Sequence, residues 1–244
     1  MLAGSGLTCT QYLSDDMRYN YLKIFYPSIL KLLLSFSFFS VAALQADELM
    51  NPEDQLTFLQ NISSQQTDIK NFTVQFEQQR HLSIMYEPLV SKGTCYFEKP
   101  DKMRWEISHP YSSILIYNSD RVAKFEIENG KVKKLNFGAA DIMRKVLQQI
   151  ISWMQGDFGE ANGLYSIEVF KGRVNKIVLV PKSEAMRVNL QKIELHVRSG
   201  DFQMDKVVIR ESETDYIQIE FRHKQDNTVL PAKLFDPASP VNLH

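Results

Sequence analysis

The residue types that most often carry catalysis are present in this chain, but their spacing matches no common catalytic or metal-binding motif. There is no H-E-x-x-H or C-x-x-C motif, no G-x-S-x-G elbow and no glycine-rich phosphate loop. Glu98 and Glu106 lie close in sequence, but they flank a predicted turn, and we interpret them as solvent-exposed charges rather than an acid–base pair. The sequence therefore gives an enzyme no support. No two of the five histidines have zinc-ligand spacing: His81, His109, His196, His223 and His244.

Large apolar side chains give a different signal. The chain has 15 Phe, 10 Tyr, 9 Met and 2 Trp, and many of them fall on predicted strands or on a predicted covering helix. For any single one of these residues, packing in the protein core is a sufficient explanation. Together they also describe a pocket lined by aromatic and flexible thioether side chains, which can adapt its shape to an apolar ligand.

The N-terminal part has the features of a secretory signal peptide. Lys23 and Lys31 supply positive charge, an apolar run follows over residues 32–44, and small residues end at Ala46. The run is shorter than the roughly 20 residues of a membrane-spanning helix, which disfavours the alternative of a membrane anchor. We therefore predict cleavage after Ala46 and a periplasmic mature protein. Met17 would be a more natural start, so residues 1–16 are a candidate gene-start error.

The predicted mature chain, residues 47–244, is long enough for a single domain with a real core. It holds 25 basic and 27 acidic residues, and its net charge of −2 argues against a nucleic-acid binder. Cys95 is its only cysteine, so it can form no intrachain disulfide. No cysteine stands directly after the predicted cut, where a lipid anchor would be attached, and we therefore do not expect the protein itself to be a lipoprotein.

A helix is predicted from Asn51 to about Gln66. Asn51 is a good N-cap and Pro52 suits the first turn. The apolar positions expected to face the core are Leu56, Leu59 and Ile62.

Two-residue alternation then predicts about ten strands. Phe72, Val74 and Phe76 share one face of the first long strand, and Met103 and Trp105 share one face of a later strand. Short turns join the strands, which indicates antiparallel pairing, and a sheet of this size tends to curl. The predicted turns include Asn129-Gly130, Lys171-Gly172 and Ser199-Gly200.

One segment, residues 139–154, has helical rather than strand periodicity. Its wide apolar face includes Ile142, Met143, Val146 and Ile150, with basic and amide side chains on the other side. The residues thus predict one strongly curved antiparallel sheet with two helices, which need an apolar surface to cover. The concave face of the sheet is the one available.

Several stretches resemble the LolA family, the periplasmic carriers that take lipoproteins to the outer membrane. The resemblance covers roughly residues 70–235 in order, and it implies a mainly β fold: an unclosed, strongly curved antiparallel β-barrel with a helical lid over a hydrophobic cavity. The stretches are FTVQFEQQR (72–80), GTCYFEKPDKMRWEISHP (93–110), SILIYNSDRVAKFE (113–126), ADIMRKVLQQIISWM (140–154) and IVLVPK (177–182).

The resemblance also implies site residues and partners. Lys99 stands where many members have the arginine that latches the lid, and Arg104 is a candidate to share that work, since a lysine is a weaker, more flexible donor. The implied partners are acylated lipoproteins or other lipids, an inner-membrane lipoprotein-release complex and an outer-membrane lipoprotein acceptor; no cofactor is implied, and a monomer is expected. The expected lipid-binding residues are Phe72, Val74, Phe76, Met103, Trp105, Ile142, Met143, Val146 and Ile150.

Two alternatives to a lipoprotein carrier remain open. One is a carrier of another lipid or amphiphile that uses the same pocket. The other belongs to a different class, a periplasmic lipid hydrolase that uses scattered carboxylates.

Overall fold

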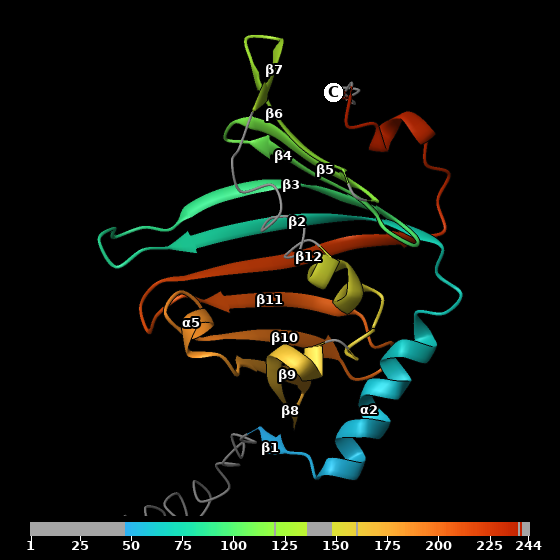
Figure 1. Ribbon diagram of the computed structural model, residues 1–244, viewed down its shortest axis with the longest axis vertical. Helices are drawn as coiled ribbons and strands as arrows, with labels where there is room; N and C mark the ends of the chain where they lie inside the picture. The colour runs from blue at the N-terminus through green and yellow to red at the C-terminus, as the bar shows by residue number, and fades with distance from the viewer. Residues whose placement is uncertain (1–46, 120, 136–147, 160, 239, 241–244) are drawn as a thin grey trace, which may run out of the picture. The chain divides into compact units, whose positions relative to one another are not determined.

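Twelve strands and a few helices make up the part of the chain that the structure describes (Figure 1). It is a computed structural model that describes residues 47–119, 121–135, 148–159, 161–238 and 240. The predicted signal peptide lies outside these ranges, so its cleavage stays a prediction. The strands are β1 (Glu48–Leu49), β2 (Asn71–His81), β3 (Leu89–Glu98), β4 (Lys102–His109), β5 (Ser112–Asn118), β6 (Arg121–Glu128), β7 (Lys131–Leu135), β8 (Tyr165–Lys171), β9 (Val174–Pro181), β10 (Lys192–Arg198), β11 (Met204–Arg210) and β12 (Tyr216–Asp226).

All twelve strands belong to one antiparallel sheet. Their order is β1-β8-β9-β10-β11-β12-β2-β3-β4-β5-β6-β7, and the edge strands β1 and β7 are not paired with each other. The sheet is therefore not closed. This confirms the mainly β fold, and the structure has two strands more than the roughly ten predicted.

Local sequence explains much of this arrangement. Phe72, Val74 and Phe76 alternate with more exposed neighbours along β2, as a strand with one buried face requires. Asn129 and Gly130 join β6 to β7 with positive φ values of 51° and 73°, which is the backbone that a tight two-residue hairpin turn needs.

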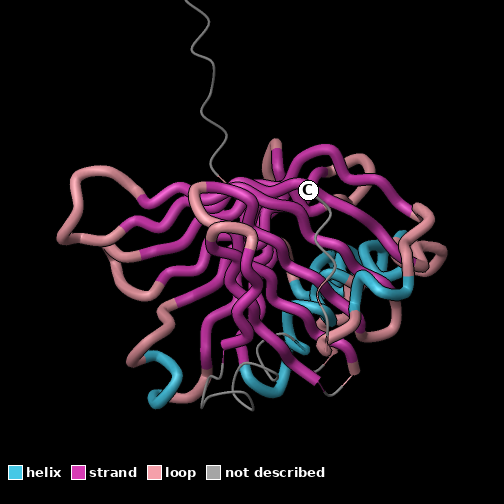
Figure 2. Tube along the Cα trace, turned by 90° about the horizontal axis from the view of Figure 1, so that it is seen from above, coloured by secondary structure: helices cyan, strands magenta, loops and turns pink. Residues whose placement is uncertain are grey.

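The sheet is strongly bent (Figure 2). Register shifts interrupt three of its pairings, at Lys92/Gly93, at His196/Val197 and between Arg222 and Gln225. An extra residue on one strand increases the local twist and bends the strand. These irregularities help to curve a sheet that is too long to lie flat.

Helix α2 (Pro52–Gln65) begins and ends as predicted. The Asn51 side chain accepts a hydrogen bond from the backbone amide of Asp54 at 2.9 Å, and Gln66 is the C-cap. The predicted buried stripe was partly wrong, because Leu56 is 58% exposed while Phe58 and Ile62 are buried. The face of α2 that packs on the core carries Phe58, Leu59 and Ile62, and Leu56 lies outside it.

The remaining helical segments are short. They are α4 (Ala161–Leu164), α5 (Glu184–Arg187) and the 3₁₀ turn η1 (Ala232–Phe235). Residues 148–154 are also helical, which agrees with the C-terminal half of the predicted helix 139–154; residues 139–147 lie outside the described ranges. Among the helices of the described residues, none combines the length and apolar character that crossing a bilayer requires.

The two faces of the sheet are built differently. The concave face carries most of the buried apolar side chains, and α2 and residues 148–154 pack against it. On the outer face, Leu234 and Phe235 of η1 are buried, and Arg104 donates to the carbonyl oxygen of Leu234 at 3.3 Å. Arg104 also pairs with Glu106 at 2.7 Å, and both side chains are almost fully buried. The outer face is thus held by a buried ion pair under the C-terminal segment.

Arg104→Met is expected to lower the free energy of unfolding by about 3–5 kcal/mol, because it leaves the buried Glu106 carboxylate without this counter-charge. Denaturant unfolding measures the loss. Arg198→Met is the matched control, since Arg198 pairs with Asp201 at the surface with its side chain 45% exposed, and about 0–1 kcal/mol is expected there. Equal losses in the two variants would contradict this account of the outer face.

Candidate functional site

The concave face of the sheet and helical residues 148–154 enclose an apolar cavity of about 370 Å³. Gln78 on β2 is the one polar side chain among the described residues that line it. Such a wall offers water few hydrogen-bonding partners, so the cavity is expected to be dry and to favour an apolar ligand. The other lining residues are Met103, Trp105, Leu115, Ile150, Trp153, Met154, Ile193, Leu195, Met204, Val207, Ile209, Ile217, Ile219 and Phe221.

Stacked aromatic rings support one wall of the cavity. Trp105 on β4 stacks on Phe76 with ring centroids 3.9 Å apart, and it meets Phe221 on β12 edge to face at 6.4 Å. Phe76 fits here because Gly93, its partner on β3, has no side chain. A Cβ at Gly93 would lie 2.7 Å from the Phe76 ring and would overlap the Glu106 carbonyl oxygen. The glycine of the G-T-C-Y-F stretch is therefore needed for this wall.

The wall also contains flexible and fluorescent side chains. Met103, Met154 and Met204 come from three different elements, and methionine can adjust to ligands of irregular shape. Trp105 and Trp153 are the two tryptophans of the chain, and both line the cavity. Intrinsic fluorescence of this protein therefore reports on the cavity.

A smaller pocket of about 50 Å³ adjoins the main cavity. The two share Trp153, Met154, Met204 and Phe221 as lining residues. The smaller pocket also touches Ile62 of α2. The apolar space thus continues from the sheet toward the C-terminal end of α2.

The turn between β3 and β4 contacts both covering helices. Lys99 Nζ donates to the backbone carbonyl of Gln66 at 2.6 Å and lies 3.4 Å from that of Thr67, where α2 ends. A cation is favourable there, because the last carbonyls of a helix carry partial negative charge. Gln155, just after the helical residues 148–154, donates to the carbonyl of Pro100 at 3.1 Å. One short turn thus forms hydrogen bonds with the C-terminal ends of both helical segments.

The structure brings only some of the expected lipid-binding residues into the main cavity. Met103, Trp105 and Ile150 line it. Phe72 and Val74 line the smaller pocket instead. Phe76 stacks on Trp105 but is not among the described lining residues of either pocket. The other expected residues, Ile142, Met143 and Val146, lie outside the described ranges.

Arg104 requires a correction. It was expected to share the latch with Lys99, but it lies on the outer face of the sheet, in register with Tyr96 and Ile116, and binds Glu106 and the η1 segment. Neighbouring residues of a strand point to opposite faces, and Met103 and Trp105 occupy the concave face. The expectation that Glu106 is solvent-exposed is wrong for the same reason, because its side chain is 4% exposed.

Strands β10, β11 and β12 supply much of the cavity wall, and the sequence did not assign any of it. Their alternating apolar residues were recognised as strand faces, among them Ile217, Ile219 and Phe221. Alternation shows which side chains share a face, but the pairing of β12 with β2 brings that face to the cavity. That pairing joins segments far apart in the chain, and no short sequence motif predicts it.

The described lining has no acid, base or nucleophile. Cys95 lies nearby in the core, where burial raises the pKa of its thiol to about 12, so it stays protonated at neutral pH. Glu194 has a strongly lowered pKa because His196, Lys192 and Arg210 hydrogen-bond to it; it lies on β10 between Ile193 and Leu195, on the face away from the cavity. What this lining can do chemically is to bury apolar surface.

Solved structures with similarity to this chain include a LolA superfamily protein from Nitrosomonas europaea, with 10% identity, a TM-score of 0.42, and coverage of 74% of this chain and 96% of that chain. The lipoprotein LppX of Mycobacterium tuberculosis has 7% identity, a TM-score of 0.43, and coverage of 74% and 99%. LprF of Mycobacterium bovis has 12% identity, a TM-score of 0.39, and coverage of 77% and 98%.

A search of curated proteins finds no match. Residues 67–238, however, match the family model described as outer membrane lipoprotein carrier protein LolA. The matched range holds β2 to β12, the Lys99 turn and the described cavity-lining residues, which confirms the resemblance seen in the sequence. The chain belongs to the LolA family of outer membrane lipoprotein carrier proteins.

Proposed function

We propose that this protein binds the acyl anchor of lipoproteins in its apolar cavity and carries them from the inner to the outer membrane. The observation that carries the proposal is the cavity of about 370 Å³ in a member of a lipoprotein-carrier family, with a single polar side chain among its described lining residues. An acyl chain has no hydrogen-bonding groups, so this lining suits it. We further propose that the protein is a binding protein and not an enzyme.

The energetics fit a carrier that must also release its cargo. Burial of an acyl chain contributes about 0.8 kcal/mol per CH₂ group, which favours shielding the chain from water. The methionines and the unfilled volume keep the wall less tightly packed than a core, and a loosely packed site binds less tightly than a rigid, complementary one. The helices are tied to the β3–β4 turn by a few hydrogen bonds, which can break and reform.

The route follows from the predicted signal peptide. We propose that residues 1–46 direct export and are cleaved after Ala46, which places the carrier in the periplasm as a monomer. Its partners would be an inner-membrane lipoprotein-release complex that loads it and an outer-membrane lipoprotein acceptor that unloads it. These assignments rest on the family and on the sequence.

Acyl binding can be measured through the two cavity tryptophans. We expect brominated fatty acids to quench the fluorescence of Trp105 and Trp153, because bromine quenches indole at contact and both rings line the cavity. Ile150→Glu should weaken this binding at least about tenfold, because it places a charge in an apolar wall. Unchanged circular dichroism and unfolding would show that the variant still folds.

Gln148→Glu is the matched control for that variant. Gln148 lies on the same helical segment but is exposed, so the same new charge should leave quenching unchanged. A lack of quenching in the wild-type protein, or equal binding by Ile150→Glu, would contradict the proposal.

The role of Lys99 can be tested separately. Lys99→Leu removes the ammonium that bonds the end of α2, and we expect a loss of about 1 kcal/mol in stability together with faster amide exchange near Gln66. Acyl affinity should fall as well, because the helical cover is held less tightly. Lys102→Leu is the control, since Lys102 pairs with Glu98 on β3 instead. Equal exchange near Gln66 in both variants would refute the latch.

A further inference from the structure

The connection between β2 and β3 exposes a run of apolar side chains. Ile84 is 89% exposed and Tyr86 is fully exposed, with Met85 between them at 43%. Leu89 and Val90, where β3 begins, are exposed as well. Single exposed apolar residues are normal, but a contiguous group of them marks an interaction site.

This loop has a defined base. Arg80 bonds Glu211 at 3.0 Å, and the backbone amide of Ser83 donates to Asp215 at 2.6 Å, so the neighbouring β11–β12 connection holds the loop. The amide of Met85 donates to the Leu82 carbonyl at 2.9 Å and closes a turn. These bonds fix the start of the loop, and its apolar tip therefore points away from the sheet.

Other exposed apolar residues lie at the same end of the strands. The pairing of Lys92 with His109 places the β4–β5 turn, with exposed Tyr111, next to the start of β3. The chain between β9 and β10 adds Val188, which is 78% exposed. The apolar loop is thus part of a wider apolar end of the molecule.

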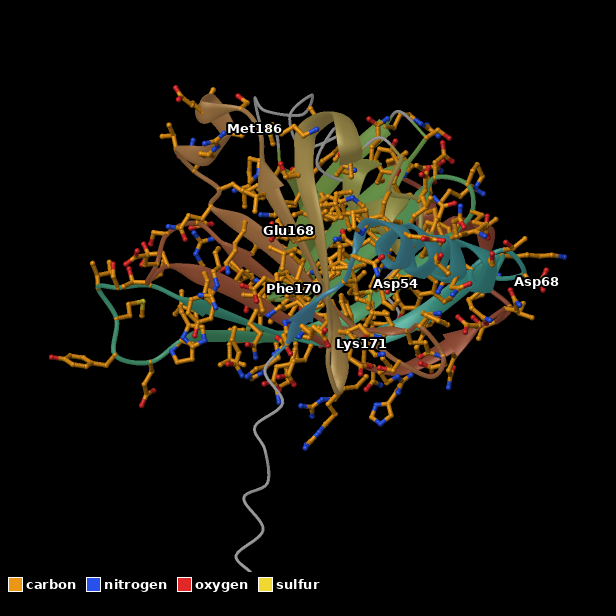
Figure 3. The ribbon with its side chains drawn as sticks, turned by 90° about the horizontal axis from the view of Figure 1, so that it is seen from below. Asp54, Asp68, Glu168, Phe170, Lys171 and Met186 are labelled. Atoms are coloured by element: carbon orange, nitrogen blue, oxygen red, sulfur yellow. The ribbon has the colours of Figure 1, made fainter. Side chains whose placement is uncertain are left out.

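The cavity reaches this end of the sheet. Its lining residues Gln78, Ile209 and Ile217 lie within three residues of the ends of β2, β11 and β12 that carry the β2–β3 and β11–β12 connections. The end of α2 lies at the other end of the strands, where β2 begins. Figure 3 shows Met186, on α5, and Asp68, just after α2, on opposite sides of the molecule. The apolar loop therefore stands near the end of the cavity that α2 does not cover.

We propose that the β2–β3 loop, residues 82–90, inserts into the surface of a phospholipid bilayer and brings this end of the cavity to the membrane. The segment contains one charge, Glu87, and its tip combines aliphatic, thioether and tyrosine side chains, the composition of an element that enters the interfacial layer. The choice of a bilayer over a protein groove rests on the proposed function, because an acyl anchor is embedded in a bilayer before loading and after release. An apolar contact there lets the anchor pass without crossing water.

Vesicle flotation tests this contact. The probe is a vesicle of phosphatidylethanolamine and phosphatidylglycerol, and the protein is the processed form isolated after export, with loss of the apolar segment 32–44 verified by mass. We expect the wild-type protein to float with vesicles, and Ile84→Glu/Tyr86→Glu to reduce the bound fraction at least about tenfold, because binding scales with buried apolar area. Val229→Glu is the control, since Val229 is 98% exposed but follows the opposite end of β12; its binding should not change.

Three outcomes would overturn the proposal. The wild-type protein could fail to float, or Val229→Glu could lose as much bound protein as Ile84→Glu/Tyr86→Glu does. The third is binding only to vesicles that carry an inner-membrane protein, which would indicate a protein partner. Quenching by brominated fatty acids in the loop variant keeps this result separate from the proposed function. Loss of flotation with normal quenching supports the loop as the membrane contact. Normal flotation without quenching in the wild-type protein would contradict the acyl cavity and leave the membrane contact standing.

Discussion

The constraint on which the structure depends is the curvature of a single antiparallel sheet that does not close. Twelve strands, bent at three irregular pairings, present one concave apolar face. An apolar face of this kind must be covered by something, and α2 and residues 148–154 are the helices that pack on it among the described residues. A cavity of about 370 Å³ remains between the sheet and residues 148–154. A flatter sheet would bring helix and strands into direct contact and would have no interior space to offer a ligand.

The outer face of the sheet contributes to stability, and the concave face forms the candidate binding site. The outer face holds the buried pair of Arg104 and Glu106 and the C-terminal residues Leu234 and Phe235, so its polar groups are satisfied away from the cavity. The concave face can therefore remain almost entirely apolar. The turn that carries Lys99 connects the sheet to the helical cover, because it joins two strands and also bonds the end of α2. A family of lipoprotein carriers fits this arrangement, in which rigidity and a loosely filled cavity occupy opposite sides of the same strands.

The sequence predicted local features well. Asn51 as a cap, the Asn129-Gly130 turn and helical residues 148–154 all follow from chemistry within a few residues of the chain. The errors arose where distant segments meet. Arg104 was expected to help Lys99, and this was wrong because the strand geometry that places Met103 and Trp105 in the cavity places Arg104 on the other face. The share of β10 to β12 in the cavity depends on the pairing of β12 with β2, which alternation cannot reveal.

The central claim is that the concave cavity carries the acyl anchor of a lipoprotein. The most direct measurement is native mass spectrometry of the protein purified, without detergent, from the cells that make it. The account predicts a complex whose extra mass is that of an acylated protein, released when the complex is activated. Protein that is repeatedly free of any ligand would contradict the claim, and a bound free lipid or pigment in place of an acylated protein would contradict lipoprotein transport.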